Sequence, residues 1–140
     1  MHTDAIEGDP DSRAHVLDAW TAAAREAIAD TGAATVRERA GCEASTLEAI
    51  QAGEIDTLSL DTVSSVVACG PDQPDAEVIA AEARDRLLLG MTRAVLDIDR
   101  LAALVETDRT ATELQQALEG RAPLPMGEFA SLRAAIARES

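Results

Sequence analysis

Apolar residues along this chain recur at intervals of three and four, the spacing that places side chains on one face of an α-helix. The first such run spans 12–30, where Val16, Trp20, Ala24 and Ile28 share a face. Similar runs predict further helices over 35–39, 45–52, 59–68, 76–96, 97–105, 110–119 and 126–138. Apolar and polar residues nowhere alternate over the length of a strand. We therefore expect an all-α fold.

Polar residues at the starts of two helices form the pattern of a capping box. In this motif a Ser or Thr hydroxyl and a Glu three residues later satisfy free backbone N–H groups. One pair is Ser45 with Glu48, and the other is Thr110 with Glu113. These pairs predict that both helices begin at the hydroxyl residue. Asp75 is expected to cap the long helix over 76–96.

The long helix over 76–96 carries an apolar stripe made of Leu87, Leu88, Met91 and Val95. A stripe at this spacing is expected to face the core. If part of it were exposed, it would be the seam of a homodimer. Gly90 lies within the helix, where a glycine marks either a kink or a close crossing of a second helix, and we favour the crossing.

One pattern of residues occurs twice in the chain. Leu47 and Gly53 of the first copy match Leu114 and Gly120 of the second. After a one-residue gap, Leu58, Leu60, Val63 and Val66 match Leu124, Met126, Phe129 and Leu132. We therefore expect two pseudo-repeated four-helix units. The predicted organisation is a flexible acidic arm over 1–10, a first unit over 11–69, a linker over 70–75 and a second unit over 76–140.

Each unit contains two short helices around a turn, followed by a glycine. The segment VRERAGCEASTLEAIQAG of the first unit resembles the helix-turn-helix of the Xre/Cro-type, lambda-repressor-like family. The matching residues are Ala40, Gly41 and Cys42 at the turn, then Leu47 and Ile50. In the second unit they are Leu101, Ala102, Leu114 and Ala117–Gly120, with Glu106 at the position of the turn glycine. The resemblance implies a helix-turn-helix core in each unit.

The resemblance also implies a partner, double-stranded DNA, which this family reads with the exposed start of the second helix of its motif. That position holds Ser45, Thr46 and Gln51 in the first unit. In the second unit the candidates are Arg100, Arg109, Thr110, Thr112, Gln115, Gln116 and Arg121. Gln pairs with adenine edges and Arg with guanine edges, while Arg100 and Arg121 would contact phosphates. The implied function is that of a transcription-regulator-like protein.

Charge changes this picture. The chain has 26 acidic residues, 12 arginines and no lysine, for a net charge of −14. Such a chain repels itself in dilute buffer but not in molar salt, where the Debye length is about 3 Å. This favours the cytoplasm of a salt-accumulating halophile, and the alternative is an ordinary acidic protein from a high-GC genome. The whole chain also resembles a small haloarchaeal family of unknown function.

The charge is uneven between the halves. Residues 1–69 hold 13 acids and 4 arginines, a net charge of −9, whereas residues 70–140 hold 13 acids and 8 arginines, a net charge of −5. If one unit reads DNA, we expect it to be the second. The alternative is that the pair is a degenerate helix-turn-helix that serves as a protein-interaction or dimerisation module without binding DNA.

Other classes of function find no support in the residues. His2, His15, Cys42 and Cys69 have no metal-ligand spacing, and no glycine-rich phosphate loop is present. Carboxylates are so numerous that none can be singled out for acid–base chemistry. We therefore expect no enzyme, no metal and no cofactor. No long apolar run or signal peptide is present, so a cytoplasmic protein with no membrane partner is expected.

Overall fold

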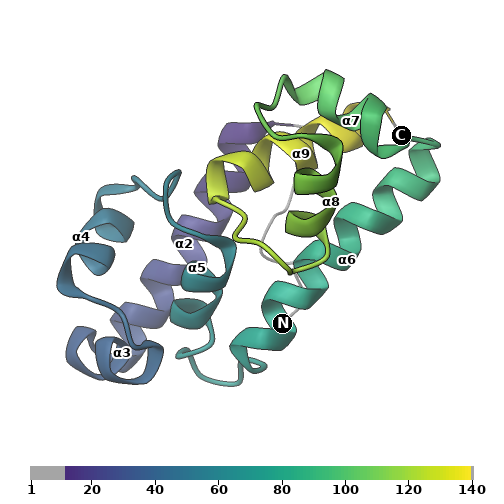
Figure 1. Ribbon diagram of the computed structural model, residues 1–140. Helices are drawn as coiled ribbons and strands as arrows, with labels where there is room; N and C mark the ends of the chain where they lie inside the picture. Colours follow the sequence, from purple (N-terminus) through teal and green to yellow (C-terminus); the bar gives the residue numbers. More distant parts are fainter. Residues whose placement is uncertain (1–11, 140) are drawn as a thin grey trace.

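The computed structural model describes residues 12–139, and within this range the chain is helical with no strand (Figure 1). The all-α expectation is confirmed. The helices are α2 (Arg13–Thr31), α3 (Ala33–Ala40), α4 (Ala44–Ala52), α5 (Leu60–Val67), α6 (Ala76–Ala94), α7 (Ile98–Val105), α8 (Ala111–Leu118) and α9 (Met126–Glu139). The predicted arm over 1–10 lies outside the described residues.

The two long helices and the two closing helices build the centre of the molecule. The helix α2 packs against α5 and α9, and α6 packs against the same pair. Figure 1 shows α3 and α4 at one end of the elongated molecule and α7 at the other. Trp20 of α2 meets Phe129 of α9 edge to face, with ring centroids 5.6 Å apart. One hydrophobic core therefore runs through residues from both halves of the chain.

Two short segments from the two halves pair directly. The Leu60 N–H donates to the Leu124 carbonyl at 2.8 Å, and the Met126 N–H donates to the Leu58 carbonyl at 2.8 Å. Between these bonds Ser59 and Pro125 lie opposite each other in an isolated antiparallel bridge. Pro125 has no N–H to donate, but the pairing loses no hydrogen bond, because its donors are the N–H groups of Leu60 and Met126. The paired positions are the ones that the sequence matches between the halves.

Glycines and caps define most helix ends as expected. Gly41 and Gly53 adopt the left-handed conformation that ends α3 and α4. The capping box of Thr110 and Glu113 is present in full at the start of α8. The crossing at Gly90 is also confirmed, because a Cβ added there would lie 2.6 Å from Cγ2 of Ile136 in α9.

Two expectations about helix ends were wrong. The capping box at Ser45 is not formed, because α4 begins at Ala44 with Glu43 as its N-cap, and no side chain caps it. Val95 does not join the core: α6 ends at Ala94, and Val95 turns left-handed with φ 56° and is 89% exposed. Asp75 is the N-cap of α6, but its side chain accepts no capping hydrogen bond.

Candidate nucleic-acid interface

The start of α4 presents few groups that could contact DNA. Ser45 and Gln51 are exposed, and Thr46 is half-buried. The helix contains no basic residue. The guanidinium of Arg25 in α2 donates to the backbone carbonyls of Ile50 at 3.2 Å and Gln51 at 2.5 Å. Its charge therefore meets the carbonyl end of α4 and not the end that would enter a groove.

The start of α8 is held by bonds within the helix. The Glu113 N–H donates to the Thr110 hydroxyl at 3.1 Å, and the Thr110 N–H donates to a Glu113 carboxylate oxygen at 2.8 Å. These hydrogen bonds, the backbone one first, lower the pKa of the Glu113 carboxyl. The first turn of α8 thus carries a stabilised negative charge where phosphate would approach.

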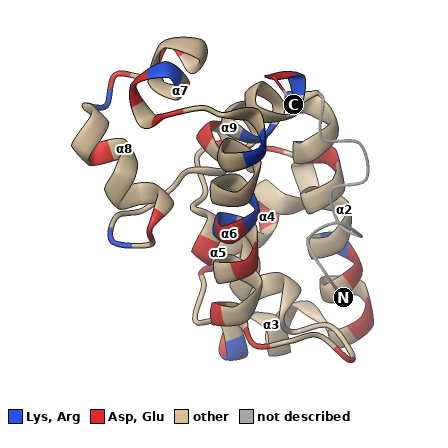
Figure 2. Cartoon of the chain, turned by 90° about the vertical axis from the view of Figure 1, so that its right-hand side faces the viewer, with Lys and Arg blue, Asp and Glu red and all other residues tan. Residues whose placement is uncertain are grey.

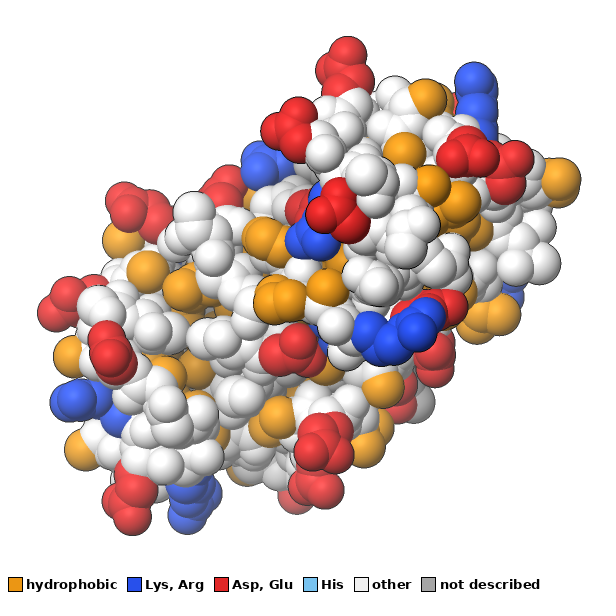
Figure 3. Space-filling view, viewed as in Figure 1, with side chains coloured by type: hydrophobic (Ala, Val, Ile, Leu, Met, Phe, Trp, Pro, Cys, Tyr) orange, Lys and Arg blue, Asp and Glu red, His pale blue; other side chains and the backbone are white. Residues whose placement is uncertain are grey.

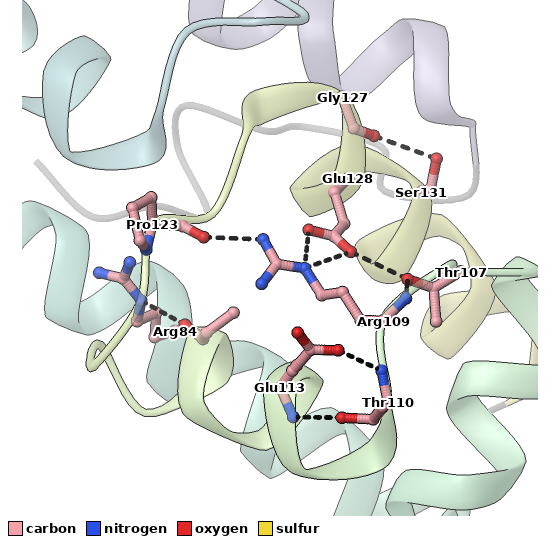
Figure 4. Close-up of polar contacts among 10 residues, drawn as sticks. Arg84, Thr107, Arg109, Thr110, Glu113, Pro123, Gly127, Glu128 and Ser131 are labelled. Carbon is pink, nitrogen blue, oxygen red and sulfur yellow. Dashed lines mark hydrogen bonds and ion pairs between the residues drawn. The ribbon is translucent and has the colours of Figure 1, made fainter.

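Arg109 is directed inward, towards the start of α9 (Figure 4). Its Nε donates to both carboxylate oxygens of Glu128, at 2.9 and 3.0 Å, and its Nη2 donates to the Pro123 carbonyl at 2.9 Å. Thr107 donates its hydroxyl to the same carboxylate at 3.2 Å. The side chains of Arg109 and Glu128 are 26% and 18% exposed. This cluster fastens the loop before α8 to α9.

The far end of α8 is similarly engaged. Gln115 donates its amide N–H to Glu119 at 2.7 Å, and Arg121 pairs with the other oxygen of the same carboxylate. The hydrogen bond from Gln115, and after it the one from Arg121, lowers the pKa of the Glu119 carboxyl. Both candidate side chains therefore already have an acidic partner on their own helix end.

The remaining candidates, Arg100, Thr112 and Gln116, differ in whether they have a charged partner. Arg100 of α7 lies 3.8 Å from a carboxylate oxygen of Glu139, and both are substantially exposed. Thr112 and Gln116 are exposed on α8, and their side chains form no hydrogen bond or ion pair with another described residue. The structure thus brings Arg109, Thr110 and Glu113 together, whereas Arg100 and Arg121 lie at other places on the second unit.

Sequence reasoning missed a buried arginine. Arg84 of α6 is 7% exposed, and its Nε donates to the Ala117 carbonyl of α8 at 2.9 Å. Its two Nη atoms donate to the two carboxylate oxygens of Asp61 in α5, at 3.1 and 3.2 Å. A signal was available, because Arg84 lies one turn from both Ala80 and Leu87 on the buried face of α6.

Arg84 and Arg25 make equivalent contacts in the two halves. Arg25 bonds the carbonyl of Ile50, three residues after Leu47, and Arg84 bonds that of Ala117, three residues after Leu114. Next to each guanidinium lies a left-handed glycine, Gly53 or Gly120, whose added Cβ would contact the arginine. Each arginine therefore binds the carbonyl end of a short helix, where a positive charge is favoured.

The exposed charges form no basic surface around α4 or α8 among the residues described. On the face shown in Figure 3, blue side chains lie as separate spots, several of them beside red ones. No group of three or more His, Cys, Asp or Glu residues within the described range could hold a metal ion. No helix in that range is long and apolar enough to cross a membrane.

A hollow with mainly apolar walls lies between α2, α3 and α4. Ile28, Ala33 and Leu47 line it, and its volume is about 620 Å³. Arg37 and Glu48 also line it, so the apolar surface is flanked by charges of opposite sign. The helix that the resemblance assigns to DNA reading thus contributes mainly apolar side chains to this hollow, together with Glu48 and Gln51.

The comparisons with known proteins give one match. A family model covers residues 16–139, and its description is a family of unknown function, DUF5791. Neither the curated proteins nor the solved structures give a match. The family model assigns no activity to any of these residues.

Proposed function

The chain belongs to the DUF5791 family, whose function is unknown, and from its surface we propose that it is a protein-binding module built on a degenerate helix-turn-helix. The observation that carries this proposal is the engagement of Arg109. A base-reading arginine must project from the start of the second motif helix. Arg109 instead bonds Glu128 and Pro123 within the fold.

The charges around both second helices support the same proposal. Arg121 and Arg100 each face a carboxylate of the same chain. Glu113 places a negative charge in the first turn of α8. This charge would repel a phosphate that approached the start of α8. Counterion release, which supplies most non-specific DNA affinity, needs several phosphate contacts from basic side chains.

The docking surface is the hollow between α2, α3 and α4. Leu47 and Ile28 line this hollow, so an aliphatic or aromatic side chain could pack there. Burying apolar surface stabilises such a complex by about 25 cal/mol per Å² removed from water. Arg37 at the rim fits a carboxylate on the same partner segment. The partner is therefore a protein segment with a large apolar side chain close to an acidic one.

Site-specific photocrosslinking in cells tests this surface. A photoreactive residue replaces Ala44 at the hollow, and for the control it replaces Ala103, an exposed residue of α7. We expect a discrete protein adduct from position 44 that Leu47→Glu or Arg37→Glu abolishes, and no such adduct from position 103. Equal adducts from both positions, none from either, or an adduct with a second copy of this chain would each contradict the proposal.

DNA reading by α8 is the second candidate, and the exposure of Thr112 and Gln116 favours it. Retention of duplex DNA is measured at low salt and in ~2 M KCl, where screening removes most charge attraction. Under the protein-binding proposal, no retention exceeds background. Retention that the double variant Thr112→Ala, Gln116→Ala loses while keeping its helical content would favour the DNA function. Arg109→Ala and Gln115→Ala are compared in the same assay.

A further inference from the structure

Both cysteines of the chain lie beside one residue of α5, Ser65. Cys42 is in the turn between α3 and α4, and Cys69 follows the end of α5, which packs against α3. Cys42 and Ser65 line the same open hollow, whose volume is about 330 Å³. The Cys69 thiol donates a hydrogen bond to the Ser65 carbonyl at 3.3 Å. Two thiols that are far apart in the sequence are therefore neighbours in the fold.

Both thiols are free and half-buried. Burial raises the pKa of the Cys69 thiol, the nearby charge of Arg39 lowers it, and that of Cys42 raises it. The charge on one sulfur thus acts on the other, in agreement with the contacts around Ser65. Both cysteines lie outside the helices, so the backbone can bring the sulfurs to a bond length of about 2.05 Å without breaking a helix.

We propose that Cys42 and Cys69 are a redox modification site, at which hydrogen peroxide produces a reversible disulfide. The bond ties the turn before α4 to the end of α5, and a thiol reductant breaks it again by exchange. It closes a loop that contains all of α4 and α5. Oxidation therefore fastens α4 to the centre of the molecule.

The two cysteines have different roles in this reaction. Cys42 lines the hollow through which a small oxidant reaches a sulfur. Cys69 keeps its proton, because its S–H donates to the Ser65 carbonyl and burial raises its pKa. The thiolate is the form that attacks peroxide. Cys42 is therefore oxidised first, and Cys69 resolves the product.

The reaction consumes one hydrogen peroxide and releases two waters. The thiolate sulfur of Cys42 attacks one peroxide oxygen, the O–O bond breaks, and the departing hydroxide takes up the proton that the thiol lost, which leaves a sulfenic acid. The Cys69 sulfur then attacks the Cys42 sulfur, the S–O bond breaks, and hydroxide leaves as water with the Cys69 proton. Both sulfurs are oxidised, and the peroxide is reduced.

Charge favours a neutral oxidant over an anionic disulfide. Glu43 and Asp61 line the same hollow as Cys42, and none of the described residues that line it is basic. Figure 2 shows acidic positions spread over much of the chain, whose net charge is −14. An anion such as oxidised glutathione is repelled by this charge, whereas hydrogen peroxide is not.

The experiment treats the reduced full chain with equimolar hydrogen peroxide, in a salt concentration at which circular dichroism shows it folded. Remaining thiols are then alkylated, and peptides are mapped by mass spectrometry. We expect an intramolecular bond between Cys42 and Cys69 that dithiothreitol reverses. It forms even with ~1 mM dimedone present, because Cys69 has a higher effective concentration than this sulfenic-acid trap. Oxidised glutathione at the same concentration should give the bond roughly ten-fold more slowly.

Two matched variants test the order of events. Cys69→Ser should accumulate the dimedone adduct on Cys42, whereas Cys42→Ser should form an adduct about ten-fold more slowly. Dimedone adducts as the main product of the wild type, disulfide-linked dimers, or an adduct that forms equally fast in both variants would overturn the proposal. So would a reaction with oxidised glutathione that is as fast as the one with peroxide.

Thermal unfolding gives a second readout. Oxidation of the wild type should raise Tm by about 5–10 °C, because the disulfide constrains the unfolded chain. Cys42→Ser and Cys69→Ser keep the same methionines and show what peroxide does to Tm without a disulfide. A rise in either variant that equals the rise in the wild type, or no rise in the wild type, contradicts the proposed bond.

Discussion

Arg84 joins three helices through one side chain. Its Nε binds the carbonyl end of α8 at Ala117, and its remaining nitrogens bind Asp61 in the first turn of α5. The Asp61 side chain is 58% exposed, so the ion pair is screened by solvent and contributes little by itself. The buried hydrogen bond and the packing of the arginine stem therefore carry most of the stabilisation.

Replacing Arg84 tests this division. We expect Arg84→Ala to lower the free energy of unfolding by about 2–3 kcal/mol, because it removes the stem and leaves the Ala117 carbonyl without its donor. Arg84→Lys restores only part of this, since Lys has no planar fork. Asp61→Asn should cost less than about 1 kcal/mol. Urea unfolding followed by circular dichroism measures all three, and equal losses for Arg84→Ala and Asp61→Asn would contradict the assignment.

Glu113 gives α8 a dependence on pH. The hydrogen bonds from Thr110 depress the pKa of its carboxyl below the ordinary value of 4.5. A depressed folded-state pKa means that its stabilisation is full above the unfolded pKa and is lost as the pH falls through the folded value. Glu113→Gln should therefore be less stable than the wild type at neutral pH, with the difference in Tm closing in acid. A constant difference from pH 7 to pH 3 would refute this.

The crossing of α6 and α9 depends on the missing side chain of Gly90. A Cβ there would lie 2.6 Å from Cγ2 of Ile136. This methyl can move only if χ1 of Ile136 changes, and a β-branched residue in a helix has one strongly preferred χ1 rotamer. Gly90→Ala should lower the free energy of unfolding by about 1–2 kcal/mol net, because crowding outweighs the gain in helix propensity.

A double-mutant cycle separates the two effects. In an Ile136→Ala background, which removes the obstructing methyl, Gly90→Ala should become neutral or stabilising by up to about 1 kcal/mol. Chemical denaturation of the four proteins gives the coupling energy. If Gly90→Ala were equally harmful in both backgrounds, the contact with Ile136 would not be the reason for the glycine.

Helix ends were predictable where a single residue decides them. Gly41 and Gly53 end helices because each adopts positive φ, and that requirement is visible in the sequence. The predicted helix start at Ser45 was wrong because α4 begins one residue earlier, at Ala44. The left-handed turn at Gly41 and the hydrogen bond from the Cys42 N–H to the Arg37 carbonyl allow this earlier start. The prediction that Val95 faces the core was wrong because the apolar spacing continues past Ala94, where α6 ends.

The candidate site was less predictable than the helices. The sequence shows that Arg109 precedes a capped helix, but its direction depends on Glu128, which is 19 residues away and belongs to another helix. The same limit applies to Arg84, because a charged residue within a helix is ordinarily exposed. Partners far apart along the chain decide the role of both side chains. Helical spacing on its own does not identify such partners.

The hydrophobic core extends through both halves, so we expect the molecule to unfold in one step. Leu60 and Leu124, from opposite halves, are both fully buried next to the backbone pairing. Either Leu→Ala substitution should lower the free energy of unfolding by about 2–4 kcal/mol and leave a single transition, with equal calorimetric and van't Hoff enthalpies. Two resolved transitions, with only one of them shifted, would show that the halves unfold independently.

The pairing around Ser59 and Pro125 has a consequence for fragments of the chain. Ser59 lies opposite its counterpart Pro125, and each of the two bonds joins a residue to the counterpart of the residue two positions away in its own half. The contact therefore resembles that between identical subunits of a twofold-symmetric dimer. A segment that complements its near copy is close to complementing itself. If the chain were cut within 70–75, each piece could associate either with the other piece or with a duplicate of itself. In the intact chain the covalent linkage favours pairing between the two different halves, because each half is held at a high effective concentration next to the other.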